Sequence, residues 1–132
     1  MTSTFLDVSV TDGLLRVLIN RPEKRNALSQ AVLDEIAAVF TAQASDETLV
    51  AATLTGAGER MTRRSSAALD TIRDFPVPVI ALLNGDALGG GAELAVACDM
   101  RVFASHAKMA FVQGTLCISP AWGGGADLVR LV

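Results

Sequence analysis

Tyrosine is absent from this 132-residue chain, which holds only one tryptophan and one histidine. Proteins that bind single-stranded nucleic acid stack bases on several aromatic side chains, so this composition argues against that class. Basic residues are also too few for a phosphate-binding surface, because 11 Lys and Arg are set against 14 Asp and Glu, for a net charge of -3. We interpret Arg63 and Arg64 as part of a solvated face. No nucleic-acid partner is expected.

Cysteine and histidine are too scarce for a disulfide scaffold or a metal site. The two cysteines, Cys98 and Cys117, both have apolar sequence neighbours, which predicts buried free thiols in a reducing compartment. His106 is the single histidine, and its neighbours predict an exposed turn. With no second histidine and no cysteine close in sequence, a metal site is not expected.

Long apolar runs and targeting signals are missing as well. The longest apolar run, Val77–Leu83, is much shorter than a membrane span. The first seven residues lack the basic and apolar regions of a signal peptide, so we expect a soluble, cytoplasmic protein with no membrane partner. Hydrophobic residues make up 51% of the chain. This length and composition suit one core, and we expect residues 1–132 to form a single domain.

Alternating strand and helix patterns predict an α/β fold. The turn Thr11–Gly13 separates two strand-like segments and predicts a hairpin, and Ser29 is predicted to cap the helix that follows it. The other predicted elements are strands at 50–54, 79–83 and 100–104, and helices at 29–44, 66–75, 89–98 and from 122 onward. This order predicts right-handed crossovers between strands, with helices covering the sheet.

The most informative motif is Leu88–Ala95 (LGGGAELA), in which three glycines precede Glu93. It follows a predicted strand and opens an apolar helix, so its uncovered N–H groups and the positive helix end suit a developing oxyanion. In one interpretation the glycines only allow close helix–sheet packing, and Glu93 complements the helix dipole. In the other, the donors and the carboxylate act together on a carbonyl group. A carboxylate on an apolar helix favours the second, because burying an unpaired charge is costly.

Two other glycine clusters are less informative. Gly56-Ala57-Gly58 half-matches the dinucleotide-binding fingerprint, but the third glycine and the later acidic residue are missing, so a turn is the better interpretation. Gly123–Gly125 is either a tight packing contact at a helix start or part of a substrate pocket. The sequence contains no P-loop and no nucleophile elbow.

Three segments together resemble the enoyl-CoA hydratase/isomerase (crotonase) superfamily. Residues 76–95 (PVPVIALLNGDALGGGAELA) resemble its core signature, residues 18–28 (LINRPEKRNAL) its substrate loop, and residues 118–124 (ISPAWGG) its pocket segment. The resemblance implies an α/β, crotonase-like ββα spiral that binds acyl-CoA thioesters and stabilises their enolates. It also implies a homotrimer or a dimer of trimers. Coenzyme A would enter as part of the substrate, with no separate cofactor.

The resemblance further implies roles for single residues. Gly90 matches the second backbone donor of the family's oxyanion hole, and Glu93 matches the first of its two hydratase glutamates. The residues expected to bind the CoA portion are Arg25, Ala27, Leu28, Gly89 and Pro120.

The chain departs from the family pattern at the second glutamate, whose position falls at Gln113. An amide cannot exchange protons as a carboxylate does, so the two-glutamate hydration is in question. We expect Gln113 to orient substrate or water by hydrogen bonding. Reactions that need one carboxylate stay open, namely isomerisation, decarboxylation and thioester hydrolysis, and so does a catalytically silent CoA-binding subunit.

Two further parts of the family pattern have no counterpart in the sequence. Relatives carry a segment of the form F-x-A-G-x-D-L that supplies the first oxyanion donor, whereas here Arg60 passes directly to Met61. Either the gene has lost this segment or the sequence omits a stretch at this point. We favour an omitted stretch, because a deletion would remove half of the oxyanion hole. The family's C-terminal helices, which complete the pocket and the trimer, would follow Val132.

Overall fold

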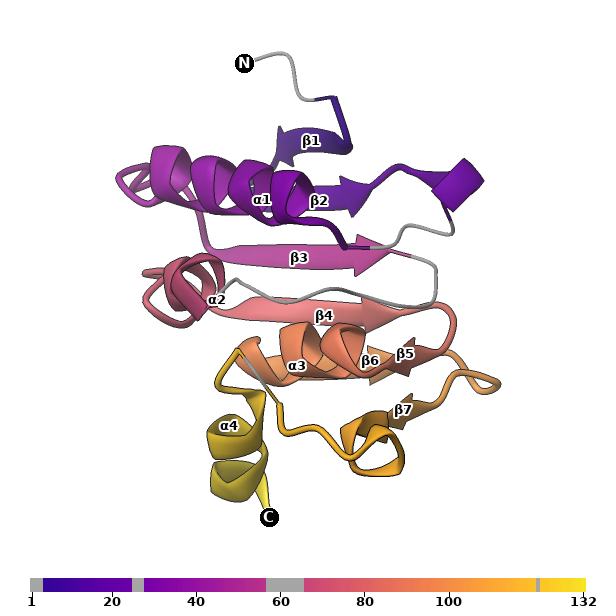
Figure 1. Cartoon of the computed structure of the whole chain (residues 1–132). Helices are drawn as coiled ribbons and strands as arrows, with labels where there is room; N and C mark the ends of the chain where they lie inside the picture. Colours follow the sequence, from indigo (N-terminus) through magenta and orange to yellow (C-terminus); the bar gives the residue numbers. More distant parts are fainter. Residues whose placement is uncertain (1–3, 25–27, 57–65, 121) are drawn as a thin grey trace.

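The computed structural model describes residues 4–24, 28–56, 66–120 and 122–132. A five-stranded sheet forms its centre (Figure 1), with the strands in the order β1-β2-β3-β4-β6. β1 runs antiparallel to β2, and the other neighbours are parallel. The strands are β1 (Leu6–Thr11), β2 (Leu14–Ile19), β3 (Ala51–Gly56), β4 (Val79–Leu83) and β6 (Met100–Phe103). The predicted α/β architecture is confirmed.

Three helices, α1 (Gln30–Gln43), α2 (Ser66–Arg73) and α3 (Gly90–Ala97), lie in front of this sheet in Figure 1. The core forms between them and the sheet, because alternate residues of β2 and β4 are buried and the residues between them are not. The largest fully buried side chains are Phe40, Leu15, Leu33, Ile36, Leu69, Ile72, Val17, Val32 and Val79.

Local signals placed the first elements correctly. The strands of the hairpin pair from Leu6 with Ile19 to Thr11 with Leu14, which leaves a two-residue turn. Asp12 and Gly13 both have positive φ angles, 51° and 75°, as a turn matched to the strand twist requires. Ser29 caps α1 as predicted, since its hydroxyl accepts a hydrogen bond from the backbone N–H of Val32 at 3.5 Å.

The small elements around the start of α3 escaped the sequence patterns. β5 (Ala87–Leu88) pairs in parallel with β7 (Met109–Ala110), and two 3-10 helices, η1 (Pro22–Lys24) and η2 (Val112–Leu116), complete the loops. Strands of two residues show no measurable periodicity, so only the folded chain reveals them. The β5–β7 pair brings η2 beside the first turn of α3. The last helix, α4 (Gly124–Leu131), then packs against α3.

The two cysteines differ in their surroundings. Cys98 is buried, as predicted, but the prediction for Cys117 was wrong, because Cys117 is exposed. It ends η2 in a left-handed conformation with φ 52°, and its apolar neighbours Leu116 and Ile118 are exposed with it. Apolar sequence neighbours therefore did not imply burial in this surface loop.

Three further features are the position of the single histidine, the grouping of side chains that could bind a metal, and the length of the helices. His106 is exposed, as predicted, with Nε2 3.1 Å from the backbone oxygen of Asn84. Within the described ranges, no group of three His, Cys, Asp or Glu side chains could hold a metal ion. None of the helices in those ranges is long and apolar enough to cross a membrane.

Candidate active site

A buried carboxylate lies at the centre of the site. Glu93, in the first turn of α3, is only 3% exposed, although every other residue of that helix is apolar or glycine. Burying a carboxylate without hydrogen-bond partners would cost several kcal/mol, so the hydrogen bonds of Glu93 decide whether the arrangement is stable.

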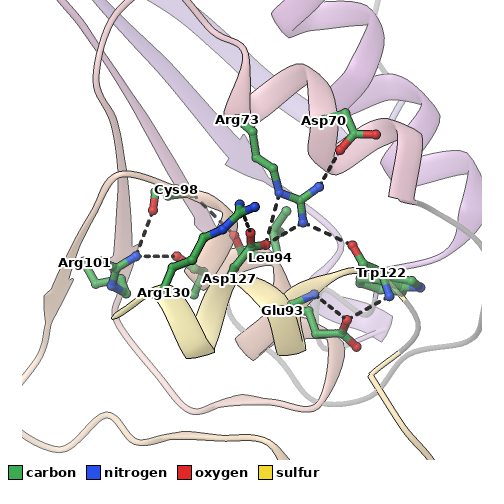
Figure 2. A network of polar contacts seen from close by, with 11 residues as sticks. Asp70, Arg73, Glu93, Leu94, Cys98, Arg101, Trp122, Asp127 and Arg130 are labelled. Carbon is green, nitrogen blue, oxygen red and sulfur yellow. Dashed lines mark hydrogen bonds and ion pairs between the residues drawn. The ribbon is translucent and has the colours of Figure 1, made fainter. Parts of the chain in front are cut away.

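Three donors satisfy Glu93. Its Oε2 accepts hydrogen bonds from the backbone N–H groups of Trp122, at 2.9 Å, and Gly124, at 3.2 Å, and the first of these is drawn in Figure 2. Its Oε1 accepts one from Nε2 of Gln113 at 2.9 Å. The backbone donors lie at the start of α4, whose capping residue Gly123 supplies no side-chain hydrogen bond. The carboxylate of Glu93 therefore accepts hydrogen bonds from N–H groups at the start of α4, a helix far away in sequence. Its negative charge also complements the positive end of that helix.

The absence of a side chain at Gly124 lets the start of α4 approach Glu93 closely enough for these hydrogen bonds. A Cβ atom at this residue would lie 2.5 Å from Cγ of Glu93 and 2.9 Å from its Cα. Any side chain would push α4 away from α3, so only glycine lets both helices approach this closely. The packing interpretation of Gly123–Gly125 is thus correct for Gly124, and the residue that it packs against is the site carboxylate.

Gln113 is the second buried polar side chain of the site, 6% exposed and carried by η2. Its Nε2 donates a hydrogen bond to Glu93. An ionised carboxylate has only acceptors, so its neighbour must supply the donor. Its Oε1 is buried and has no hydrogen-bond partner within the described part of the chain. An unpartnered buried acceptor is costly, so this oxygen is available to a water or substrate donor.

The backbone N–H groups of two glycines before Glu93 have different roles: that of Gly89 is used by the fold, whereas that of Gly90 is left for the site. Gly89 has a φ of 58° and caps α3, and its N–H donates to the oxygen of Ala110 at 2.9 Å, so the small sheet uses this donor. The first intrahelical bond of α3 runs from the N–H of Glu93 to the oxygen of Gly89 at 3.0 Å. The N–H of Gly90 comes before that bond and has no acceptor within the helix. This arrangement suits the oxyanion role expected of Gly90.

A small, mainly apolar cavity of about 60 Å³, with Thr55 and Asp86 among its lining residues, lies on another side of α3. The last residues of three parallel strands, Ile19, Gly56 and Leu83, line it, and ligands of α/β folds bind at this edge of parallel sheets. Burial raises the pKa of the Cys98 thiol to about 12, so Cys98 lines the cavity as a neutral group. Leu28 also lines it.

The two sides of α3 have different partners. Gly91, Leu94 and Cys98 follow helical spacing along the cavity, whereas Glu93 faces α4 and η2. The helix therefore separates an apolar space on one side from a carboxylate held by donors on the other.

The structure brings together only part of the predicted site. Glu93 and Gln113 are in direct contact, and Gly90 lies one turn before Glu93 on the same helix. Pro120 is half-buried, and a Cβ atom at Gly125 would lie 3.5 Å from its Cγ. Arg25 and Ala27 lie outside the described residues, and so do Gly58, the Arg60–Met61 junction and the pair Arg63 and Arg64.

Sequence reasoning missed the groups that hold Glu93 from outside α3. The N–H groups of Trp122 and Gly124 are backbone donors, and no side-chain pattern announces them. The guanidinium of Arg73, which contacts the same segment, was not singled out. The only available signal was the lack of a capping side chain before α4, which left its donors in need of an acceptor.

Comparisons with known proteins show which sequences and folds this chain is similar to. The family model described as enoyl-CoA hydratase/isomerase matches residues 59–132. The crotonyl-CoA hydratase of Syntrophomonas wolfei is 38% identical over 92% of this chain and 55% of its own length. The short-chain-enoyl-CoA hydratase of Clostridium acetobutylicum is 36% identical over 88% of this chain and 52% of its own length. An enoyl-CoA hydratase structure from Bacillus anthracis gives a TM-score of 0.88 at 30% identity, covering 98% of this chain and 58% of that one.

The chain spans about half the length of these curated relatives. The alignment with the Syntrophomonas protein runs over 142 residues, more than the 132 of this chain. That relative therefore carries residues inside the aligned region that this chain lacks. The expectation about the Arg60–Met61 junction stays a prediction.

Proposed function

This chain belongs to the enoyl-CoA hydratase/isomerase family, and from that membership and its site we propose that it is an acyl-CoA thioester enzyme that stabilises an enolate. Hydration or double-bond isomerisation of an enoyl-CoA is the reaction that we favour. The observation that carries the proposal is the buried Glu93 carboxylate, held by three donors one helical turn from the N–H of Gly90.

The proposed chemistry divides between Gly90 and Glu93. A thioester enolate carries its negative charge on oxygen, and the N–H of Gly90 would donate to that oxygen at the positive end of α3. Residues three apart on a helix lie on neighbouring positions of one face, so Glu93 is placed to exchange a proton beside the same carbonyl.

We assign the proton transfer to Oε1 of Glu93. Two backbone N–H groups occupy Oε2, whereas Oε1 accepts a single hydrogen bond, from Gln113, among the described residues. Oε1 therefore keeps a lone pair for a substrate or water proton. When Oε1 is protonated, rotation of the Gln113 amide would present its own oxygen as the acceptor.

The substrate class rests on the relatives. Two of them are named for crotonyl-CoA and for short-chain enoyl-CoA, and we propose a short enoyl-CoA thioester for this chain. The CoA portion would lie against the predicted set, Arg25, Ala27, Leu28, Gly89 and Pro120. A cytoplasmic location and a homotrimer or dimer of trimers belong to the same proposal.

Gln113 supports a second candidate. Family resemblance places a second glutamate at this position, and an amide cannot take or give a proton in its place. Decarboxylation of an acyl-CoA whose α-carbon carries a carboxylate needs only one proton: the bond from the α-carbon to the carboxylate breaks, CO2 leaves with the enolate behind it, and a proton from water, delivered directly or through Glu93, then binds the α-carbon. Thioester hydrolysis and binding of CoA by a silent subunit are less favoured candidates.

A substrate panel tests the proposal. The protein is assayed for hydration of crotonyl-CoA and for decarboxylation of methylmalonyl-CoA, and binding of both thioesters is measured by calorimetry. We expect turnover of one of them and a loss of about 100-fold or more in Glu93→Gln, because the proton-transfer group is removed. Glu47→Gln, which removes an exposed carboxylate between α1 and β3, is the matched control. Binding without turnover would favour the silent subunit, and full activity of Glu93→Gln would refute the proposed role.

A further inference from the structure

Trp122 links Glu93 to a second group of charged residues. Its backbone N–H donates to Oε2 of Glu93 at 2.9 Å, and its backbone oxygen accepts from Nη2 of Arg73 at 3.1 Å. Figure 2 shows these two contacts on either side of Trp122. Arg73 is the last residue of α2, so an element outside the proposed chemistry reaches the segment that orients the carboxylate.

Asp127 completes the connection. Its Oδ2 accepts from Nη2 of Arg73 at 2.6 Å and from Nε at 3.1 Å, so the guanidinium meets one oxygen with two of its nitrogens. Asp127 lies in the first turn of α4 and is buried. Arg73 therefore holds the start of α4 at two points, Asp127 and the oxygen of Trp122, and that same start supplies both backbone donors to Glu93.

The rest of α4 gives this start little support. The helix has eight residues, and its capping residue Gly123 supplies no side-chain hydrogen bond. Short helices are marginal without tertiary contacts. The position of the Trp122–Gly124 donors thus depends on α3 and on Arg73.

The electrostatics of Arg73 favour a fixed position. Burial opposes its charge, but hydrogen bonds and the nearby charges of Asp127 and Asp70 raise the pKa of its guanidinium above the ordinary value. Asp70 binds Nη1 at 2.6 Å from an exposed position, and Arg130 lies 3.7 Å from the other oxygen of Asp127. The Arg73–Asp127 contact is the partly buried member of the group, where ion pairs are least weakened by solvent.

We propose that Arg73, together with Asp127, is a positioning residue for Glu93: it holds the Trp122–Gly124 backbone so that the carboxylate keeps its orientation. This inference rests on the proposed function, in which Glu93 transfers the proton. Arg73 does not touch the substrate. It acts through the N–H groups of Trp122 and Gly124, and a small displacement of the carboxylate is enough to slow a proton transfer.

Kinetics separate positioning from simple stabilisation. In Arg73→Met we expect kcat for the substrate found in the panel to fall about 10- to 100-fold, with KM nearly unchanged, at a temperature where the variant is folded. Arg16→Met, which removes an exposed arginine of β2, is the matched control and keeps kcat. If Arg73→Met does not fold, Arg73→Lys replaces it, because a lysine can meet Asp127 or Trp122 but not both. An unchanged kcat in a folded Arg73 variant would overturn the inference.

A charge exchange sharpens the test. In the double variant Arg73→Asp with Asp127→Arg, the ion pair between α2 and α4 can form again, but residue 73 no longer donates to the oxygen of Trp122. We expect Tm to recover relative to Arg73→Asp alone, while kcat stays low. Recovery of kcat in parallel with Tm would show that Arg73 only joins the two helices and would overturn the positioning role.

Amide hydrogen exchange gives a readout that needs no turnover. We expect the N–H groups of Trp122 and Gly124 to exchange faster in Arg73→Met than in the wild type, while buried α1 amides such as that of Ile36 are unchanged. If Glu93→Gln keeps full activity, the proposed function fails whatever the exchange result. If Glu93→Gln is inactive but Arg73→Met changes neither exchange nor kcat, only the positioning role of Arg73 fails.

Discussion

The side-chain amide of Gln113 donates to Oε1 of Glu93 at 2.9 Å, so an amide occupies the place beside the proposed proton-transfer group where the family pattern implies a carboxylate. Both side chains are buried. This pair therefore contains one ionisable group, whereas a two-glutamate site would contain two. When Glu93 is ionised, the amide of Gln113 can still donate a hydrogen bond to it. This relationship favours reactions in which one carboxylate handles one proton at a time.

Replacing Gln113 by glutamate should make the pair compete for a proton. In Gln113→Glu two carboxyl groups would be in direct contact, and both cannot be ionised without a large cost, so the new carboxyl should have a pKa above its ordinary value of about 4.3. We expect the variant to lose about 1–3 kcal/mol of unfolding free energy at pH 8 and to regain part of it at pH 5. A raised folded-state pKa gives this direction, because the stability is lost as pH rises.

Urea unfolding at the two pH values measures this effect. Gln43→Glu, at the end of α1, serves as the control and should change stability by about 0.5 kcal/mol or less. Equal stability of Gln113→Glu at both pH values would contradict the contact between the two side chains.

The same glycine-to-alanine change should have opposite effects at two positions of the α3–α4 pair. Gly124→Ala places a methyl group 2.5 Å from Cγ of Glu93, so we expect a loss of about 1–3 kcal/mol in stability. At Gly91 the added Cβ would meet only the Cβ of Ala87, at 3.8 Å. Gly91→Ala should therefore gain up to about 1 kcal/mol from helix propensity. Thermal unfolding of both variants decides the matter, and equal Tm shifts would argue against the close approach at Gly124.

Buried Cys98 should make the protein less stable in alkali. Its folded-state pKa is raised to about 12, whereas an unfolded thiol ionises near pH 8.5. The unfolded chain therefore loses this proton first, and stability is full below about pH 8.5 and falls between that value and about pH 12, by up to about 1.4 kcal/mol per pH unit. The chain has no tyrosine and only two lysines, so few other groups titrate in this range.

Denaturant titrations between pH 8 and pH 11 test this dependence. Cys98→Ala should flatten the curve, even if the variant is less stable at pH 8. A slope as steep in Cys98→Ala as in the wild type would assign the alkaline loss to another group.

The two thiols should also react at different rates. Cys117 is exposed and Cys98 is buried, so a thiol reagent at neutral pH should modify one residue per folded chain and two after unfolding in denaturant. Mass spectrometry of peptides identifies the modified site. In Cys117→Ala the folded protein should stay unmodified, and rapid labelling of Cys98 in that variant would show that its burial is transient.

Local sequence patterns predicted much of the fold, because the signals for these elements involve residues that are close in sequence. A two-residue turn at Asp12 and Gly13, the cap at Ser29 and the apolar run that became β4 depend on neighbours within a few residues. Pairings such as β5 with β7 join residues about twenty positions apart over only two residues each, and a linear pattern does not contain them. Cys117 fails for a related reason, because burial depends on what the rest of the chain places over a residue.

Three kinds of information were present in the amino-acid order itself: the α/β succession of elements, the glycine-rich helix start with Glu93, and the amide Gln113 at a position where the resemblance implies a glutamate. The partners of Glu93 were not, because Trp122 and Gly124 act through backbone N–H groups that every residue except proline possesses. Arg73 joined the site only when α2 and α4 met, since 54 positions separate it from Asp127. Residue type thus specified which group can carry a proton, and chain folding specified what holds it in place.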